Sequence, residues 1–169
     1  MKKLVLFFIV TASLMGCTSS EPKTSKEDAN IALFKENATI VKTLLDGFVK
    51  NDFSQDDLFS DTAKFDGPGL GAVVLNKTSN LAALKTLRDL NAELSYSDLI
   101  FLPAVDSITF KPDGNVRVFA KWSGTGKNGA TVKNKYFGIF VFNTDHKVIY
   151  VDEYQDMTGI IQALTAPKK

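Results

Sequence analysis

The chain has 169 residues, of which 44% are hydrophobic and 23% charged, and its formal net charge at pH 7 is +1. This length suits one domain with a sizeable core, and near-neutrality argues against nucleic acid as a partner, because that function calls for a basic stripe. The single Cys, Cys17, leaves no pair for a disulfide. The single His, His146, falls in a predicted turn, so no metal site and no cofactor are expected.

Residues 1–16 have the pattern of a secretory signal peptide. Lys2 and Lys3 precede an apolar run, residues 4–15, that is too short to span a bilayer of ~30 Å. Residues 14–17, LMGC, resemble the bacterial lipobox. The resemblance implies that Cys17 becomes the lipidated N-terminus of a lipoprotein, anchored to a membrane of the bacterial cell envelope and facing the periplasm or the exterior. An ordinary cleaved signal with an incidental Cys is the alternative.

Residues 17–30 are polar, contain Pro22 and lack apolar periodicity, which predicts a flexible tether between the anchor and the domain. A long amphipathic helix is then predicted from residue 31 to about 51, because apolar residues recur at three- and four-residue spacing. The stripe consists of Ile31, Phe34, Ala38, Val41, Leu44, Leu45 and Phe48.

Shorter elements follow this helix. Residues 52–59 predict a short helix with Ser54 as its N-cap, and residues 63–66 predict a brief strand. The glycines and proline of residues 67–71 then predict a loop. A further helix is expected from Ser79 to about Leu94, with leucines along one face.

The second half is rich in Val, Ile, Phe and Tyr and predicts strands at residues 106–110, 115–124, 133–143 and 147–156. A short helix, residues 157–164, closes the chain. Hairpins that follow a helical half indicate an α+β fold. Residues 124–129, GTGKNG, match a dinucleotide-binding fingerprint literally. They precede a strand rather than a helix, which indicates a hairpin loop.

Asn128-Gly129 is the strongest hairpin signal in the chain. A two-residue turn there would place Trp122 opposite Lys135, with Lys135 near the rim of the sheet. One face is then predicted to line a ligand pocket under the helices. Its pocket residues would be Trp122, Phe137, Tyr150, Asp152 and Tyr154.

Asp152 has two interpretations on such a face. It is either a buried acid satisfied by hydrogen bonds, or a desolvated acid whose raised pKa suits acid–base chemistry. The opposite face would expose more aromatic surface than a solvated face usually does, which predicts a homodimer, unless another segment covers it. Its aromatic residues would include Phe119, Tyr136, Phe140 and Phe142.

The order of these elements resembles the SnoaL-like branch of the nuclear transport factor 2 superfamily. The similar pieces are Trp122 before a Gly-rich hairpin, the strand YFGIFVF (residues 136–142), and a last strand that ends at Asp156 before GIIQAL. The resemblance implies an α+β, cystatin-like architecture over residues 31–165. A cone-shaped, curved antiparallel sheet would pack against N-terminal helices around an apolar pocket, with the outer face of the sheet often forming a dimer.

Enzymes of that family use acids, a Tyr or a His inside the cone. The counterparts here are Asp66, Asp152, Tyr154 and Asp156, and no matching His is present. The favoured interpretation is a lipid-anchored protein that binds a small hydrophobic molecule without turnover. The first alternative is a small cyclase-, isomerase- or hydrolase-like enzyme with Asp152 or Asp156 as the catalytic acid or base. The second is a dimeric interaction module without a ligand.

Overall fold

The computed structural model describes residues 26–69 and 71–168, so Cys17 and the predicted signal peptide lie outside the described residues. No helix among the described residues is long and apolar enough to cross a membrane. The helices are α1 (Lys26–Lys50), the 3-10 helix η1 (Asp56–Leu58), α2 (Lys77–Asp89) and α3 (Met157–Thr165). The strands are β1 (Phe59–Asp66), β2 (Leu75–Asn76), β3 (Asn91–Val105), β4 (Pro112–Gly126), β5 (Thr131–Phe142) and β6 (Val148–Tyr154).

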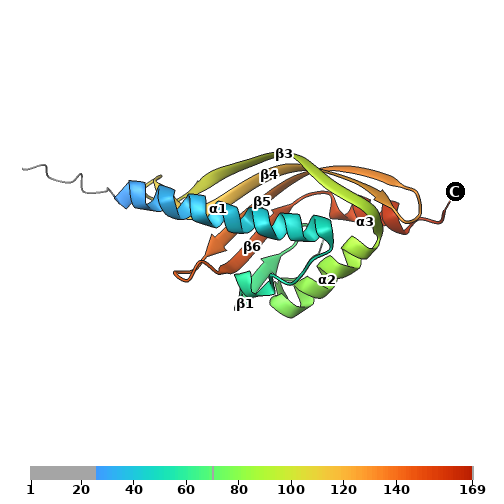
Figure 1. Ribbon diagram of the computed structural model, residues 1–169, viewed down its shortest axis with the longest axis horizontal. Helices are drawn as coiled ribbons and strands as arrows, with labels where there is room; N and C mark the ends of the chain where they lie inside the picture. The colour runs from blue at the N-terminus through green and yellow to red at the C-terminus, as the bar shows by residue number, and fades with distance from the viewer. Residues whose placement is uncertain (1–25, 70, 169) are drawn as a thin grey trace, which may run out of the picture.

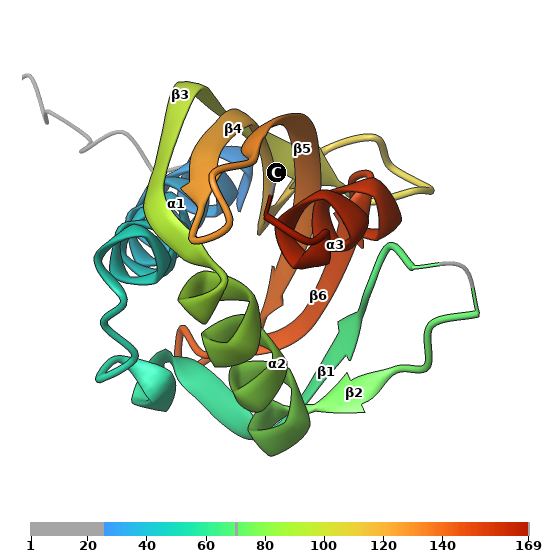
Figure 2. The ribbon, with the colours of Figure 1, turned by 90° about the vertical axis from the view of Figure 1, so that its right-hand side faces the viewer.

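The strands form one six-stranded sheet in the order β2-β1-β6-β5-β4-β3, and its pairs are antiparallel except for β1 with β6. The sheet is curved and unclosed. Strands β3, β4 and β5 arch along the long axis of the molecule, and α1 lies against them (Figure 1). The view turned by 90° shows α2 and α3 in front of the sheet (Figure 2). The predicted α+β class with a curved sheet and N-terminal helices is confirmed.

Helix α1 buries its predicted apolar stripe against the sheet. Val41 is fully buried, as are Val116 and Val118 of β4 and Val148 of β6. The helix ends at Lys50, and the next residue, Asn51, has a positive φ of 58°, the left-handed conformation common after a helix. Its start is earlier than predicted, so residues 26–30 are helical and not part of a tether. The Asn30 side chain donates to the Pro112 carbonyl (2.6 Å) and ties this turn to the sheet.

The sequence pattern does not predict strand β3, since it favours helix for residues 91–94 and a strand for residues 106–110. The chain instead forms a strand of 15 residues at Asn91–Val105, and residues 106–110 belong to the loop after it. The register shifts between Ser97 and Ile100, where Asp98 has a φ of 52°. Tyr96 packs on the core before this bulge, and Leu99 and Phe101 pack on it afterwards. The bulge interrupts the two-residue alternation by which a strand is recognised.

Three shorter assignments also differ. The short helix after α1 is a single 3-10 turn whose N-cap is Gln55 rather than Ser54; the amide of Ser54 instead bonds the Asp52 carboxylate at 2.9 Å. Strand β1 begins at Phe59, four residues before the predicted strand. Helix α2 begins at Lys77, because the Asn76 side chain accepts from the Ser79 amide (2.9 Å) and caps it.

The β4–β5 hairpin has a three-residue loop rather than the two-residue turn predicted at Asn128-Gly129. Gly126 and Ala130 are bonded (2.7 Å), and in the loop only Gly129 has a positive φ, 87°. Trp122 therefore pairs with Asn134 and not with Lys135. A shift of one residue exchanges the two faces of β5 and β6 relative to β4.

The Asn128 side chain explains why this loop is preferred. Its Nδ2 donates to the carbonyls of Ala163 and Ala166 (2.9 Å each), and its Oδ1 accepts from the Ala130 amide (3.0 Å). The amide thus satisfies carbonyls at the end of α3, which a helix leaves unpaired.

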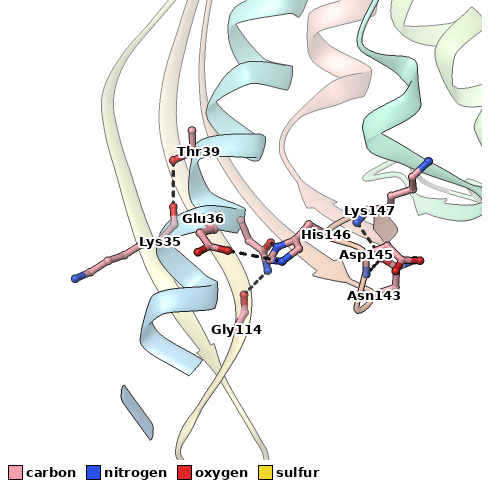
Figure 3. Close-up of polar contacts among 9 residues, drawn as sticks. Lys35, Glu36, Thr39, Gly114, Asn143, Asp145, His146 and Lys147 are labelled. Carbon is pink, nitrogen blue, oxygen red and sulfur yellow. Dashed lines mark hydrogen bonds and ion pairs between the residues drawn. The ribbon is translucent and has the colours of Figure 1, made fainter. Parts of the chain in front are cut away.

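A polar clamp joins α1, β4 and the β5–β6 turn. The buried Asn37 donates to the Gly114 carbonyl (2.9 Å) and bonds the Nδ1 of His146 through its own Oδ1 (3.0 Å). Glu36 Oε2 lies 3.7 Å from the other ring nitrogen of His146 (Figure 3). The predicted turn position of His146 is confirmed, and its ring contributes to packing between elements.

Candidate functional site

A cavity of about 130 Å³ lies between the helices and the concave face of the sheet. Helices α1, α2 and α3 all contribute apolar side chains, and the sheet contributes Trp122, Phe140 and Val151. The helical lining includes Leu44, Leu45, Phe48, Leu81, Leu84, Leu87, Met157 and Ile160. The regular leucine spacing of α2 therefore places Leu81, Leu84 and Leu87 in the lining of the cavity.

Glu153 and Tyr136 are an acidic and a phenolic group that meet in this mostly apolar space, whose lining also includes Asp52 and Asp56. They lie on neighbouring strands, and the Tyr136 hydroxyl donates to Glu153 Oε1 at 2.9 Å. Tyr136 is 4% exposed, whereas Glu153 keeps partial exposure because it lines the cavity. A carboxyl group thus faces the cavity with one hydrogen bond already made to it.

Gly138 makes this contact between neighbouring strands geometrically possible. It lies two residues after Tyr136 on the same face of β5 and pairs directly with Glu153. A Cβ at this position would come within 2.5 Å of the Tyr136 hydroxyl and 2.9 Å of its ring carbon Cζ. The absence of a side chain therefore lets the Tyr136 ring lie across the strand toward β6.

Burial changes the acidity of both groups. The pKa of Glu153 is raised, mainly by desolvation, with the charge of Asp152 acting in the same direction and the hydrogen bond from Tyr136 opposing it. The pKa of Tyr136 is raised well above its ordinary value by desolvation, by the charge of Glu153 and by their hydrogen bond. The site therefore favours a neutral tyrosine beside a carboxyl group that holds its proton more tightly than an exposed glutamate.

A second hollow of about 270 Å³ lies beside the cavity, toward the β1–β2 connection. Phe65, Asn80, Val151 and Glu153 line both spaces. Glu153 thus occupies the boundary between them. A molecule larger than the first cavity would extend past this carboxyl group.

Trp122 is the predicted pocket residue that lines the cavity. Its ring makes edge contacts with Phe48, Tyr96 and Tyr136 at centroid distances of 5.7, 5.4 and 6.3 Å. The Tyr96 hydroxyl in turn donates to Asp46 on α1, and Lys42 bonds the same carboxylate at 2.7 Å. These bonds, first that from Lys42, lower the pKa of Asp46. The Trp122 wall is consequently held from both α1 and β3.

The other four predicted pocket residues lie on the opposite face. Phe137, Tyr150, Asp152 and Tyr154 are not among the residues that line the main cavity, because the hairpin loop shifts β5 and β6 by one position. The four residues still share one face of the sheet, and Phe137 faces Tyr154 across the two strands.

Aromatic rings and carboxylates group on this outer face. Phe119 stacks on Phe137 at 4.7 Å, and Phe137 stacks on Tyr154 at 5.6 Å. The Tyr154 hydroxyl bonds Asp152 at 2.8 Å, and that of Tyr150 bonds Asp66 at 3.3 Å.

The remaining members of the predicted outer face are placed differently. Tyr136 and Phe140 are buried in the core, and Phe142 packs against it. Lys135 is exposed and pairs with Lys121. Both lie on the face of the sheet opposite the cavity.

Asp156, the second predicted catalytic acid, caps a helix. Its carboxylate accepts from the Gly159 amide at 2.9 Å at the start of α3. An N-cap carboxylate satisfies an otherwise unpaired amide, so local structure accounts for this residue. Among the described residues, no group of three or more His, Cys, Asp or Glu could hold a metal ion.

Asn91 lies at the edge of the cavity and is 5% exposed. Its Nδ2 donates to the Leu87 carbonyl at 3.0 Å, whereas its buried Oδ1 has no hydrogen-bond partner. A Cβ at Gly124 would lie 2.8 Å from that oxygen, so the amide packs directly on the glycine backbone. This close packing fixes the junction between α2 and β3.

No protein-family model matches the chain, and no curated protein matches it by sequence. Solved structures do match. A SnoaL-like protein from Jannaschia sp. CCS1 is 18% identical, with a TM-score of 0.59 over 79% of this chain and 94% of that chain. An NTF2-like protein from Burkholderia xenovorans LB400 is 19% identical, with a TM-score of 0.57 over 78% and 97%. A steroid delta-isomerase from Pseudomonas aeruginosa is 17% identical, with a TM-score of 0.53 over 76% and 85%.

At these identities the likeness shows the fold, which is that of the SnoaL-like and NTF2-like proteins. The fold alone does not transfer a function, because function resides in the particular side chains of the site.

Sequence reasoning missed Glu153 and Tyr136. The signal that could have identified them is the spacing of the hairpin. A three-residue loop ending at Gly129 places Tyr136 on the same face as Trp122, and Glu153 then follows from the β5–β6 pairing. The loop choice depends on the contact between Asn128 and α3, which is distant in sequence.

Proposed function

We propose that the protein binds a small, mostly apolar molecule in the cavity. The observation that carries this proposal is the cavity of about 130 Å³, which is lined mostly by apolar side chains of three helices and the sheet and which Glu153 and Tyr136 also line. Such a space holds a molecule of about one aromatic ring. Apolar pockets bind by burial while a few polar groups fix orientation, so the ligand should present one hydrogen-bonding group to Glu153.

Trp122 provides a direct test, because it is the single tryptophan of the chain and lines the cavity. Native mass spectrometry of the protein purified from its own host should reveal a retained small molecule. After its removal, titration with the recovered compound should change the fluorescence of Trp122.

Two apolar-to-phenylalanine substitutions form a matched pair. Leu84→Phe adds bulk inside the cavity and should weaken binding, whereas Ile139→Phe on the outer face should leave it unchanged. Equal affinity for both variants would contradict binding at this place.

A second candidate function is acid–base catalysis by Glu153, which replaces Asp152 and Asp156 in that role. It is supported by the position of a carboxyl group inside a mostly apolar cavity, where desolvation raises its pKa, a condition that suits acid–base chemistry. Tyr136 would orient the carboxyl group. Structural neighbours include a steroid delta-isomerase and a pinacolase, which shows that this fold carries enzymes.

Glu153→Gln separates binding from catalysis, because the amide keeps the shape of the side chain but cannot transfer the proton. If the protein is an enzyme, the variant purified from the host should retain a chemically different compound, substrate in place of product, which chromatography and fragmentation distinguish even where an isomerisation leaves the mass unchanged. The same compound in both proteins would contradict turnover and leave binding intact.

Attachment to a membrane through Cys17 is proposed from the LMGC sequence. Metabolic labelling with a fatty-acid analogue should mark the wild type and not Cys17→Ser. Label that persists in the variant would rule out this anchor.

A homodimer through the outer face of the sheet is also proposed, with the residues that the structure places on that face. The support is the stack of Phe119, Phe137 and Tyr154, together with the exposed Ile100 and Leu102 on β3. Sedimentation should show a dimer that Phe119→Ser weakens. A monomer at all concentrations tested would contradict it.

A further inference from the structure

The loop between β3 and β4 presents two large apolar side chains to solvent. Residues 106–111 are named the tip here. Ile108 is 84% exposed and Phe110 is 77% exposed, the two highest values among the large hydrophobic side chains that the structure describes. Neither side chain contributes appreciably to the core.

Backbone and side-chain bonds order the tip. The Asp106 carboxylate accepts from the amides of Ile108 (3.1 Å) and Thr109 (2.7 Å) and from the Thr109 hydroxyl (2.9 Å). The Phe110 amide donates to the Asp106 carbonyl, and the Asp106 amide donates to the Lys111 carbonyl, each at 2.9 Å. The two apolar side chains are therefore held outward by a defined turn.

Phe110 has a φ of 57°, in the left-handed region where Gly and Asn are favoured and a bulky residue is an outlier. A phenylalanine here costs backbone free energy and gains little from burial. Stability does not explain this side chain, so a contact outside the described chain is the physical alternative.

The tip lies at the end of the molecule where α1 begins. Asn30 of α1 bonds the Pro112 carbonyl, next to the tip, and a Cβ at Gly114 would lie 3.2 Å from Leu33. In Figure 1 the start of α1 and the far ends of β3 and β4 share one end of the long axis, and α3 lies toward the other.

The chain before α1 determines what this end faces. Residues 18–25 separate Cys17 from α1, so Cys17 and Lys26 can be at most ~32 Å apart when this segment is fully extended. With Cys17 lipidated, as proposed above, the start of α1 cannot move farther than this from the bilayer. The tip is the exposed apolar surface at the end of the domain where this segment joins α1.

We propose that the tip contacts the membrane and inserts Ile108 and Phe110 into the headgroup region of the bilayer. Transfer of apolar side chains from water into the interface is favourable. Two side chains alone bind weakly, but the anchor raises their effective concentration at the surface, so that the weak contact is occupied. The contact would fix the orientation of the domain on the membrane.

The test places a tryptophan at the tip of the full-length protein. Ile108→Trp is reconstituted into phosphatidylcholine–phosphatidylglycerol vesicles whose acyl chains carry bromine, which quenches tryptophan on contact. The matched control is Ile161→Trp, at a position 44% exposed on α3. Trp122 contributes equally to both variants, and the wild type measures its share.

The tryptophan at residue 108 is expected to be quenched about twofold more strongly than that at residue 161, as for a side chain several ångströms within the interface. Equal quenching in protein that floats with the vesicles would overturn the contact while leaving the anchor intact. Failure to float would overturn both. A lower oligomeric mass in an Ile108→Ser, Phe110→Asn variant would assign the tip to contact between copies instead, and would likewise overturn the proposal. None of these outcomes bears on the ligand cavity.

Discussion

Two tyrosine–carboxylate pairs occupy opposite faces of the same two strands. Tyr136 bonds Glu153 at 2.9 Å inside, and Tyr154 bonds Asp152 at 2.8 Å outside. The bond lengths are alike, and the acids are neighbours in sequence. Exposure separates the pairs, because Tyr136 is 4% exposed and Tyr154 is 54% exposed.

The causes of the pKa shifts differ accordingly. Desolvation is the largest cause for Tyr136, whereas the hydrogen bond to Asp152 is the largest for Tyr154. A hydrogen bond in water replaces bonds to solvent and is worth little, while a buried pair cannot lose one partner without leaving the other unsatisfied. Burial, and not the tyrosine–carboxylate pair itself, therefore changes the acidity of the interior groups.

The largest effect is expected from Gly138→Ala. The added Cβ would lie 2.5 Å from the Tyr136 hydroxyl, so the ring must move and the inner pair must separate, at ~1–3 kcal/mol of unfolding free energy. Gly67→Ala is the control, because its added Cβ meets nothing within 4 Å. Chemical denaturation measures both. Equal stability of the two variants would show that Gly138 does not create the interior pair.

Removal of one hydroxyl from each pair compares them directly. Tyr136→Phe should cost ~1–3 kcal/mol, because it leaves a buried carboxyl group without its donor. Tyr154→Phe should change the unfolding free energy by less than ~0.5 kcal/mol, as for an exposed position. A similar loss in both variants would break the comparison.

A smaller, pH-dependent effect should distinguish the two acids. Folding raises the pKa of Glu153 above its ordinary value of 4.5, mainly by desolvation. Between the unfolded-state pKa and the higher folded-state pKa, the folded protein binds a proton that the unfolded chain has lost. Its contribution to unfolding free energy therefore falls as pH rises through that window. Glu153→Gln should gain stability relative to the wild type as the pH increases. Asp152→Asn is measured in parallel, and an equal gain there would remove the distinction.

Much of the fold follows from local sequence patterns. The apolar spacing of residues 31–48 predicts α1, and the short helix expected at residues 157–164 agrees with α3. The curved sheet followed from the resemblance of the element order to known proteins. Strand β3 could not be read, because the bulge at Asp98 reverses which residues point inward.

The prediction of the site depended on the register of β5 relative to β4, and an error of one residue exchanged the two faces of β5 and β6. The pattern of β5 and β6 grouped Phe137, Asp152 and Tyr154 correctly, but alternation alone cannot say which group shares a face with Trp122. That choice follows from the loop, and the loop follows from bonds of Asn128 to the end of α3. Such tertiary contacts have no signature within the hairpin itself.

The length of α1 sets a distance as well as a packing surface. At 1.5 Å per residue, the cavity residues Leu44 to Phe48 lie roughly 21–27 Å along the helix from Asn30. With the tip seated on a bilayer and the helix directed away from it, the cavity would stand clear of the lipid headgroups. A ligand would then arrive through the surrounding aqueous compartment or from a protein docked beside the domain, rather than by diffusing sideways out of the membrane.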